Sequence, residues 1–116
     1  MASLNMPNGP YNLTTDEVDK RIKVGSIGNY AYGHKKVDGT FVVEYVGRSD
    51  TDLNDRIKHG IGQYKMFKYS IAYTKKSAFE KECRNYHDFG ESDTLDNIDH
   101  PDKPDFTDYK CPVCGK

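Results

Sequence analysis

The segment Cys111–Gly115, with the sequence Cys-Pro-Val-Cys-Gly, places the strongest constraint on how this chain can fold. In such a segment two thiolates converge on one metal ion while backbone N–H groups point at the sulfur atoms, which is the pattern of a zinc knuckle. The chain contains three cysteines, an odd number that fits poorly with a disulfide framework. A zinc ion needs four ligands, so the C-terminal segment must fold back onto residues elsewhere in the sequence.

The remaining ligands are predicted on a helix that precedes the tail. Cys83 and His87 are four residues apart, which puts both side chains on the same face of a helix. With Cys111 and Cys114 they would give a Cys3His site for a structural Zn²⁺, because four protein ligands leave no open position. His100 competes with His87 for the fourth position because it is nearer to the knuckle in the sequence. The zinc would tie a tail with few apolar residues to the rest of the domain.

Hydrophobic periodicity predicts the class of fold. Alternating apolar residues indicate strands, and apolar residues three and four apart indicate helices. In order, the pattern predicts a helix at 14–23, strands at 26–32 and 40–46, a helix that begins near 48–51 and ends near Gly60 or Gly62, a strand at 67–74 and a helix at 77–88. The expected fold is α+β, with a small, mostly antiparallel three-stranded sheet flanked by helices and a zinc-tethered C-terminal tail.

The same periodicity assigns side chains to faces. Phe41, Val43 and Tyr45 alternate along the second strand and should share one of its faces. Ile61 continues the buried stripe of the helix that follows residue 51, and Tyr73 continues the alternating face of the third strand. These positions are therefore expected to lie toward the interior.

Charge is unevenly distributed along the chain, whose net charge is −1. Residues 18–87 contain fourteen basic and eight acidic side chains, whereas residues 88–116 contain three and eight. A basic body is compatible with phosphate binding, although charge alone favours the simpler explanation that it keeps a small domain soluble. The expected organisation is an N-terminal arm at 1–12, a core at 13–90 and an acidic tail with the knuckle at 91–116.

Two short motifs lie on the predicted strand pair, namely Gly28-Asn29-Tyr30 and Tyr45-Val46-Gly47. Arg56 follows on the next predicted helix with His59 one turn later, and Glu82 lies on the last predicted helix. In this order the residues resemble the signature of the GIY-YIG nuclease superfamily, and the resemblance covers about residues 25–90.

The chain departs from the usual pattern of that superfamily within the first motif and in the spacing between the two motifs. Its middle residue is the polar Asn29, and the gap between Tyr30 and Tyr45 is longer than usual. Both departures leave Tyr32 as an alternative to Tyr30 for the first-motif tyrosine.

The resemblance implies hydrolysis of phosphodiester bonds with one catalytic ion, Mg²⁺ or Mn²⁺. Glu82 would bind that ion, since such sites hold Mg²⁺ through few carboxylates plus water and phosphate oxygens. Arg56 would bind the scissile phosphate with its forked donors. Tyr30 would orient or deprotonate the attacking water, and deprotonation requires a lowered phenol pKa. Tyr45 would support the water network, and His59 could assist proton transfer.

Three further residues, Gly47, Arg48 and Lys58, are expected to contact the substrate. Gly47 should let the chain turn sharply without a side chain that blocks the site. Glu82 and Cys83 are adjacent, so their side chains point about 100° apart around a helix. One helix could therefore face the catalytic site with Glu82 and the zinc site with Cys83.

The leading hypothesis is a metal-dependent endonuclease that acts on nucleic acid, with DNA as the expected partner. Each residue also has a simpler interpretation: Tyr45 could pack in the core, Arg56 could pair with Asp52 at the surface, and Glu82 could be a solvated helix residue. The alternatives are a non-catalytic domain of the same type that binds nucleic acid or protein, and a zinc-stabilised interaction module whose likeness to the nucleases is accidental.

No apolar run approaches the roughly 20 residues needed to span a bilayer, and no secretory leader is visible. With reduced cysteines, these features predict no membrane partner and a cytoplasmic location. A chain this small would contact few phosphates, so its binding should be weak and salt-sensitive unless it forms a homodimer or joins a larger protein partner.

Overall fold

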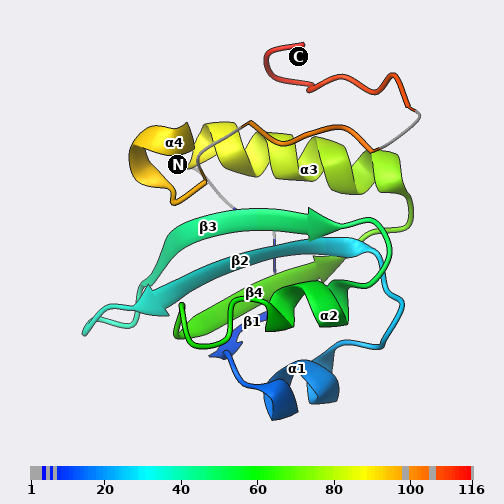
Figure 1. Ribbon diagram of the computed structural model, residues 1–116. Coiled ribbons are helices and arrows are strands. Elements are labelled where there is room, and N and C mark those ends of the chain that lie inside the picture. Colours follow the sequence, from blue (N-terminus) through cyan, green and yellow to red (C-terminus); the bar gives the residue numbers. More distant parts are fainter. Residues whose placement is uncertain (1–3, 5, 7, 98–99, 105–106, 116) are drawn as a thin grey trace.

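The computed structural model describes residues 4, 6, 8–97, 100–104 and 107–115, and it shows an α+β fold built on an antiparallel sheet (Figure 1). Within these residues the sheet has four strands in the order β1-β4-β2-β3. The strands are β1 (Asn8–Asn12), β2 (Gly28–Lys35), β3 (Phe41–Ser49) and β4 (Met66–Ile71). The helices are α1 (Thr15–Arg21), α2 (Leu53–Lys58), α3 (Lys75–Asp88) and α4 (Glu91–Thr94). The predicted α+β class is confirmed, whereas the predicted number of three strands is wrong.

The additional strand comes from the segment that we expected to be an arm. Asn8–Asn12 pairs antiparallel with β4 at one edge of the sheet, and Leu4 and Met6 are buried. In the sequence, Pro10 argues against a strand at 8–12, because proline has no N–H to donate to a neighbouring strand. The segment can still form an edge strand, since an edge strand pairs on one side only. Some positions of the expected arm and tail lie outside the described residues, namely 1–3, 5, 7, 98–99, 105–106 and 116.

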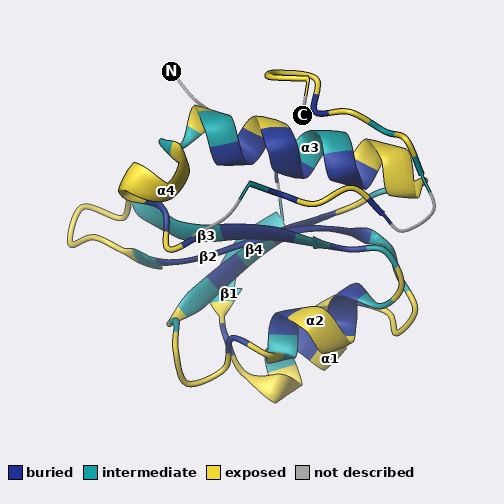
Figure 2. Ribbon diagram, turned by 45° about the horizontal axis from the view of Figure 1, so that its top comes forward, coloured by how far each residue is buried: buried dark blue, intermediate teal, exposed yellow. Residues whose placement is uncertain are grey.

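Helices cover both faces of the sheet. α3 packs on β2 and β3 from one side, and α1 and α2 lie on the other side (Figure 1). Figure 2 shows that the buried residues of α3 face the sheet and that most of β2 is buried. The core on the α2 side contains Leu13, Val18, Ile22, Tyr30, Tyr32, Leu53, Ile57, Phe67 and Tyr69. The core on the α3 side contains Leu4, Met6, Ala31, Val46, Tyr86 and Leu95.

A β-bulge in β3 divides its side chains between these two cores. The register with β2 shifts by one residue at Glu44, between Val43 and Tyr45. Because one extra residue reverses the alternation of faces, Tyr45 packs against the α2-side core while Phe41 and Val43 pack against the α3-side core. The expectation that Phe41, Val43 and Tyr45 share one face is therefore wrong.

Two of the expected buried stripes end earlier than the sequence predicts. α2 ends at Lys58, and Ile61 beyond it is 38% exposed. β4 ends at Ile71, and Tyr73 beyond it is 96% exposed. In the part of the chain that the structure describes, no helix has the length and apolar character needed to cross a bilayer.

Asn97 attaches the tail to the free edge of the sheet. Its side-chain amide donates a hydrogen bond to the carbonyl oxygen of Val46 (2.8 Å) and accepts one from the Val46 N–H (3.0 Å). Because β3 is an edge strand, Asn97 supplies the partners that another strand would supply. Both residues are buried, so these polar atoms depend on each other rather than on water.

We predict that Asn97→Ala lowers the free energy of unfolding by about 2 kcal/mol, because it leaves the buried N–H and C=O groups of Val46 without partners. Urea denaturation followed by circular dichroism measures the change. Asn12→Ala is the matched control, because Asn12 is exposed and its loss should change the free energy by less than about 0.5 kcal/mol. Equal effects of the two variants would contradict the proposed role of Asn97.

Candidate functional site

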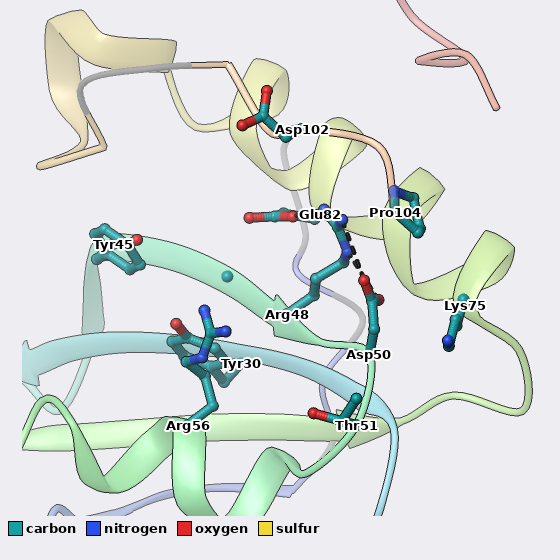
Figure 3. Close-up of a pocket in the computed structure, with 11 residues that line it drawn as sticks. Tyr30, Tyr45, Arg48, Asp50, Thr51, Arg56, Lys75, Glu82, Asp102 and Pro104 are labelled. Atoms are coloured by element: carbon teal, nitrogen blue, oxygen red, sulfur yellow. Dashed lines mark hydrogen bonds and ion pairs between the residues drawn. The ribbon is translucent and has the colours of Figure 1, made fainter. Parts of the chain in front are cut away.

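A polar pocket of about 520 Å³ opens at the edge strand β3 (Figure 3). Arg48 and Glu82 reach it on the α3 side of that strand, whereas Tyr30 and Arg56 reach it on the α2 side. The pocket therefore joins the two faces of the sheet around its edge. Its lining residues are Tyr30, Tyr45, Gly47, Arg48, Asp50, Thr51, Arg56, Lys75, Glu82, Asp102 and Pro104.

The structure brings most of the predicted catalytic and substrate-binding residues into this pocket. They are Tyr30, Tyr45, Gly47, Arg48, Arg56 and Glu82. Lys58 does not line the pocket, because its ammonium group pairs with Asp19 of α1 at 2.6 Å. His59 lines an adjoining cavity instead and lies 3.3 Å from the carboxylate of Asp55.

Gly47 makes room for Tyr30 rather than for a turn. The two residues face each other across the β2–β3 pairing. A Cβ atom at position 47 would overlap the ring and hydroxyl of Tyr30. The expectation of a sharp turn at Gly47 is wrong because β3 continues to Ser49. A side chain at position 47 would displace the tyrosine from the pocket wall.

Tyr30 and Tyr32 were alternatives for the first-motif tyrosine, and their surroundings now distinguish them. The Tyr32 hydroxyl donates to the backbone carbonyls of Arg56 (3.2 Å) and Ile57 (2.9 Å), so it serves to anchor α2. Tyr32 lines only the adjoining cavity, whereas Tyr30 lines both that cavity and the polar pocket. Tyr30 is therefore the tyrosine of the first motif that can reach a ligand in the polar pocket.

Burial raises the phenol pKa of both pocket tyrosines. For Tyr30, desolvation is the largest cause, Tyr32 and Tyr45 add to it, and the nearby cation of Arg56 opposes it. For Tyr45, burial and then Glu82 raise the pKa while Arg56 opposes the shift. Both phenols are therefore neutral near pH 7, and each can donate and accept hydrogen bonds.

Glu82 is only 8% exposed and is held by an ion pair. Arg48 Nη1 lies 2.6 Å from Glu82 Oε1, and Arg48 Nε lies 3.0 Å from Asp50 Oδ1. Burial raises the pKa of Glu82, while the charge of Arg48 opposes that shift. The guanidinium also lies over the ring of Phe79, 5.1 Å from its centroid. Arg48 thus neutralises a buried carboxylate instead of lying free for the substrate.

A second group of side chains joins α3 to the C-terminal tail. Ligand atoms of His87, His100, Cys111 and Cys114 all lie within 4.8 Å of one another. This Cys2His2 group could bind a metal ion such as zinc. The two histidines that competed for one position in the sequence analysis are both members of the group, and Cys83 is not.

The surroundings of the two histidines fit a bound ion. His87 Nδ1 lies 2.6 Å from Glu91 Oε2, and His100 Nδ1 lies 2.8 Å from the Pro101 carbonyl oxygen. A metal-bound histidine commonly uses its second nitrogen in this way, so Nε2 is left for the ion. His87 Nε2 is buried and lacks a hydrogen-bond partner among the described residues, so its lone pair is available to bind a metal ion.

Cys111 and Cys83 have opposite pKa shifts. Burial opposes ionisation of Cys111, but the backbone N–H groups of Cys114 and Val113 outweigh it, together with His100, and lower its pKa to about 6. Burial, followed by the neighbouring Cys111, raises the pKa of Cys83. Cys111 can therefore bind a metal as the thiolate near neutral pH, and Cys83 packs beside it.

Sequence reasoning missed several residues of the polar pocket. Asp50 and Thr51 lie two and three residues after Arg48, where the sequence predicts the start of a helix rather than a pocket wall. Asp102 and Pro104 come from the tail, two and four residues after the candidate metal ligand His100. This short separation could have predicted their position, because a metal ion that holds His100 also holds the residues next to it in the chain.

No protein-family model matches this chain, and neither a curated protein nor a solved structure matches it. The interpretation of the pocket therefore depends on its own geometry and chemistry.

We predict that the protein binds about one Zn²⁺ per chain and that His100→Ala weakens its zinc affinity by about 100-fold or more, because a ligand is lost. Cys83→Ala should keep the zinc, since Cys83 lies outside the group of four ligands. For both variants, the zinc content that remains after competition with a chelator is measured by mass spectrometry. His34→Ala is the control, because His34 pairs with Glu44 away from the group. Loss of zinc from Cys83→Ala with retention in His100→Ala would support the predicted Cys3His set instead.

Proposed function

We propose that this protein is a metal-dependent endonuclease of the GIY-YIG type that hydrolyses phosphodiester bonds in DNA. The observation that carries the proposal is the convergence of Tyr30, Tyr45, Arg56 and Glu82 in one polar pocket. These residues come from β2, β3, α2 and α3, and they are distant in sequence. Their meeting at one site is the arrangement that their order along the chain implies for such a nuclease.

The residues present fit a single hard divalent cation. Glu82 offers a carboxylate, of which Oε1 is bonded to Arg48. Mg²⁺ and Mn²⁺ accept such oxygen ligands and keep several waters, and the pocket has room for a hydrated ion. When bound, the ion would stabilise the charge that develops on the scissile phosphate and on the leaving oxygen. Arg48 would have to share or release the Glu82 carboxylate at that point.

Arg56 is placed to bind the scissile phosphate. Its side chain is exposed, and its guanidinium reaches the pocket beside the Tyr30 hydroxyl (Figure 3). A guanidinium remains charged at any working pH and offers parallel donors that match two phosphate oxygens. Lys75 lines the same pocket and supplies a second positive charge.

Tyr30 is best suited to orient the attacking water. Its raised pKa disfavours the phenolate, so we assign it a positioning hydrogen bond rather than removal of the proton. Tyr45, whose ring is stacked 6.3 Å from that of Tyr30, would fix the same water network from the next strand. His59 is assigned no proton-transfer step, because it lies in the adjoining cavity.

A second candidate function is favoured by one observation. The 2.6 Å ion pair between Arg48 and Glu82 occupies the carboxylate that a catalytic metal needs. If this pair persists with ligand bound, the domain would bind DNA through Arg56 and Lys75 without cutting it. Assays of DNA cleavage and of divalent-metal binding distinguish the two functions, because only the nuclease requires both.

We predict that the wild-type protein nicks or linearises supercoiled plasmid with Mg²⁺ or Mn²⁺ and that Glu82→Gln lowers the rate by about 100-fold or more, because the metal ligand is lost. Gel electrophoresis of time courses measures the rate. Glu80→Gln is the matched control, since Glu80 is on the same helix but does not line the pocket. It should cut at nearly the wild-type rate.

If the wild-type protein cuts neither plasmid, branched DNA nor RNA in the presence of metal, the nuclease proposal is rejected. The second candidate, a domain that binds DNA without cutting it, would then remain. Equal loss of activity in Glu80→Gln and Glu82→Gln would reject the specific role of Glu82.

A further inference from the structure

A second cavity of about 240 Å³ adjoins the polar pocket and has a different chemical character. Four tyrosines line it, namely Tyr30, Tyr32, Tyr45 and Tyr64. Tyr30, Tyr45 and Arg56 line both spaces, so the two share a wall. We call the second space the tyrosine cavity. A ligand could occupy both at once.

Tyr45 and Tyr64 are the more accessible rings of the tyrosine cavity, since Tyr30 and Tyr32 are only 3% and 4% exposed. Tyr32 and Tyr64 are stacked with their centroids 4.8 Å apart and their planes within 12°. Tyr45 lies 6.3 Å from Tyr64 and is half-buried, as is Tyr64. The hydroxyl of Tyr64 donates to Asp96 at 2.8 Å, which holds its ring in place. Gly60 completes the wall, because a Cβ atom there would collide with the Tyr32 ring.

Away from Arg56 and His59, the cavity suits an uncharged, planar, hydrogen-bonding ligand. Gln63 is exposed at the wall and offers both a donor and an acceptor. The carboxylate of Asp96 beside Tyr64 would repel a phosphate but does not oppose a neutral ring. The volume lies below the roughly 300–1,000 Å³ of a site for a drug-sized molecule. It therefore fits a fragment of a larger ligand.

We propose that the tyrosine cavity binds one unpaired nucleobase of DNA, next to the phosphate held in the polar pocket. The inference rests on the proposed function, because that function places the phosphate at Arg56. Aromatic side chains bind bases by stacking, and Arg56 at the shared wall would link the base to its own phosphate. A base can enter only after it leaves the duplex stack. The preferred substrate is therefore DNA with an unpaired base beside the phosphate, and not a fully paired duplex.

Binding in a variant that cannot cut tests this proposal apart from catalysis. In Glu82→Gln, fluorescence anisotropy compares a duplex carrying one unpaired adenine with the same duplex carrying an abasic site at that position. We expect the adenine duplex to bind about tenfold more tightly or better, since stacking of one base contributes about 1–3 kcal/mol. Equal affinities for the two duplexes, or no binding of either, would overturn the proposal.

Substitutions at Tyr64 then locate the base. Tyr64→Leu should remove the preference for the adenine duplex, whereas Tyr64→Phe, which keeps the ring, should retain it. Tyr73→Leu is the matched control, because Tyr73 is 96% exposed and does not line the cavity. Thermal unfolding of each variant verifies its fold. Equal preferences in Tyr64→Leu and Tyr73→Leu would overturn the assignment of the cavity.

The two proposals fail in different ways. A base preference that depends on Tyr64, in a wild-type protein that never cuts DNA, would keep the tyrosine cavity and reject the nuclease. Metal-dependent cutting with no preference between adenine and abasic duplexes would keep the nuclease and reject the cavity as a base site.

Discussion

The antiparallel pairing of β2 with β3 determines where the residues of the polar pocket lie. It sets Tyr30 opposite Gly47 and Tyr32 opposite Tyr45, so these three tyrosines share one face of the sheet. A shift of β3 by one residue along β2 would turn Tyr45 to the face opposite Tyr30. Because β3 is an edge strand, α2 can approach the pocket from one face and α3 from the other. Side chains from two faces of one sheet can therefore meet around its edge.

The helix α3 connects the two sites of the molecule. Glu82 points from this helix into the polar pocket, and His87 belongs to the Cys2His2 group. The tail makes a second connection, because His100 is two residues from Asp102 in the pocket wall. Metal at the Cys2His2 group would hold the tail across α3, so one ion would influence the shape of a pocket that it does not touch. Within the pocket, a divalent cation of the proposed nuclease would compete with Arg48 for the Glu82 carboxylate.

Much of this arrangement could be predicted from residue patterns. The spacing of apolar residues indicated β2, β3, β4, α2 and α3, and the order of Tyr30, Tyr45, Arg56 and Glu82 indicated residues that now share one pocket. The misses have physical causes: Pro10 concealed an edge strand, and a bulge is not visible in local periodicity. Helical spacing paired Cys83 with His87, but it could not show that the tail brings His100 to the metal group. The adjacency of the tyrosine cavity to the pocket also depends on distant segments, which no local pattern records.

We propose that one helix, α3, serves two distinct metal sites. The most direct test is a crystal structure of the protein soaked in Mn²⁺, with anomalous scattering measured at the zinc and manganese edges. We expect a zinc peak among His87, His100, Cys111 and Cys114, and a separate manganese peak beside Glu82 with Arg48 moved from its carboxylate. A zinc peak bound by Cys83, or an unbroken Arg48–Glu82 pair with no manganese beside it, would contradict the account.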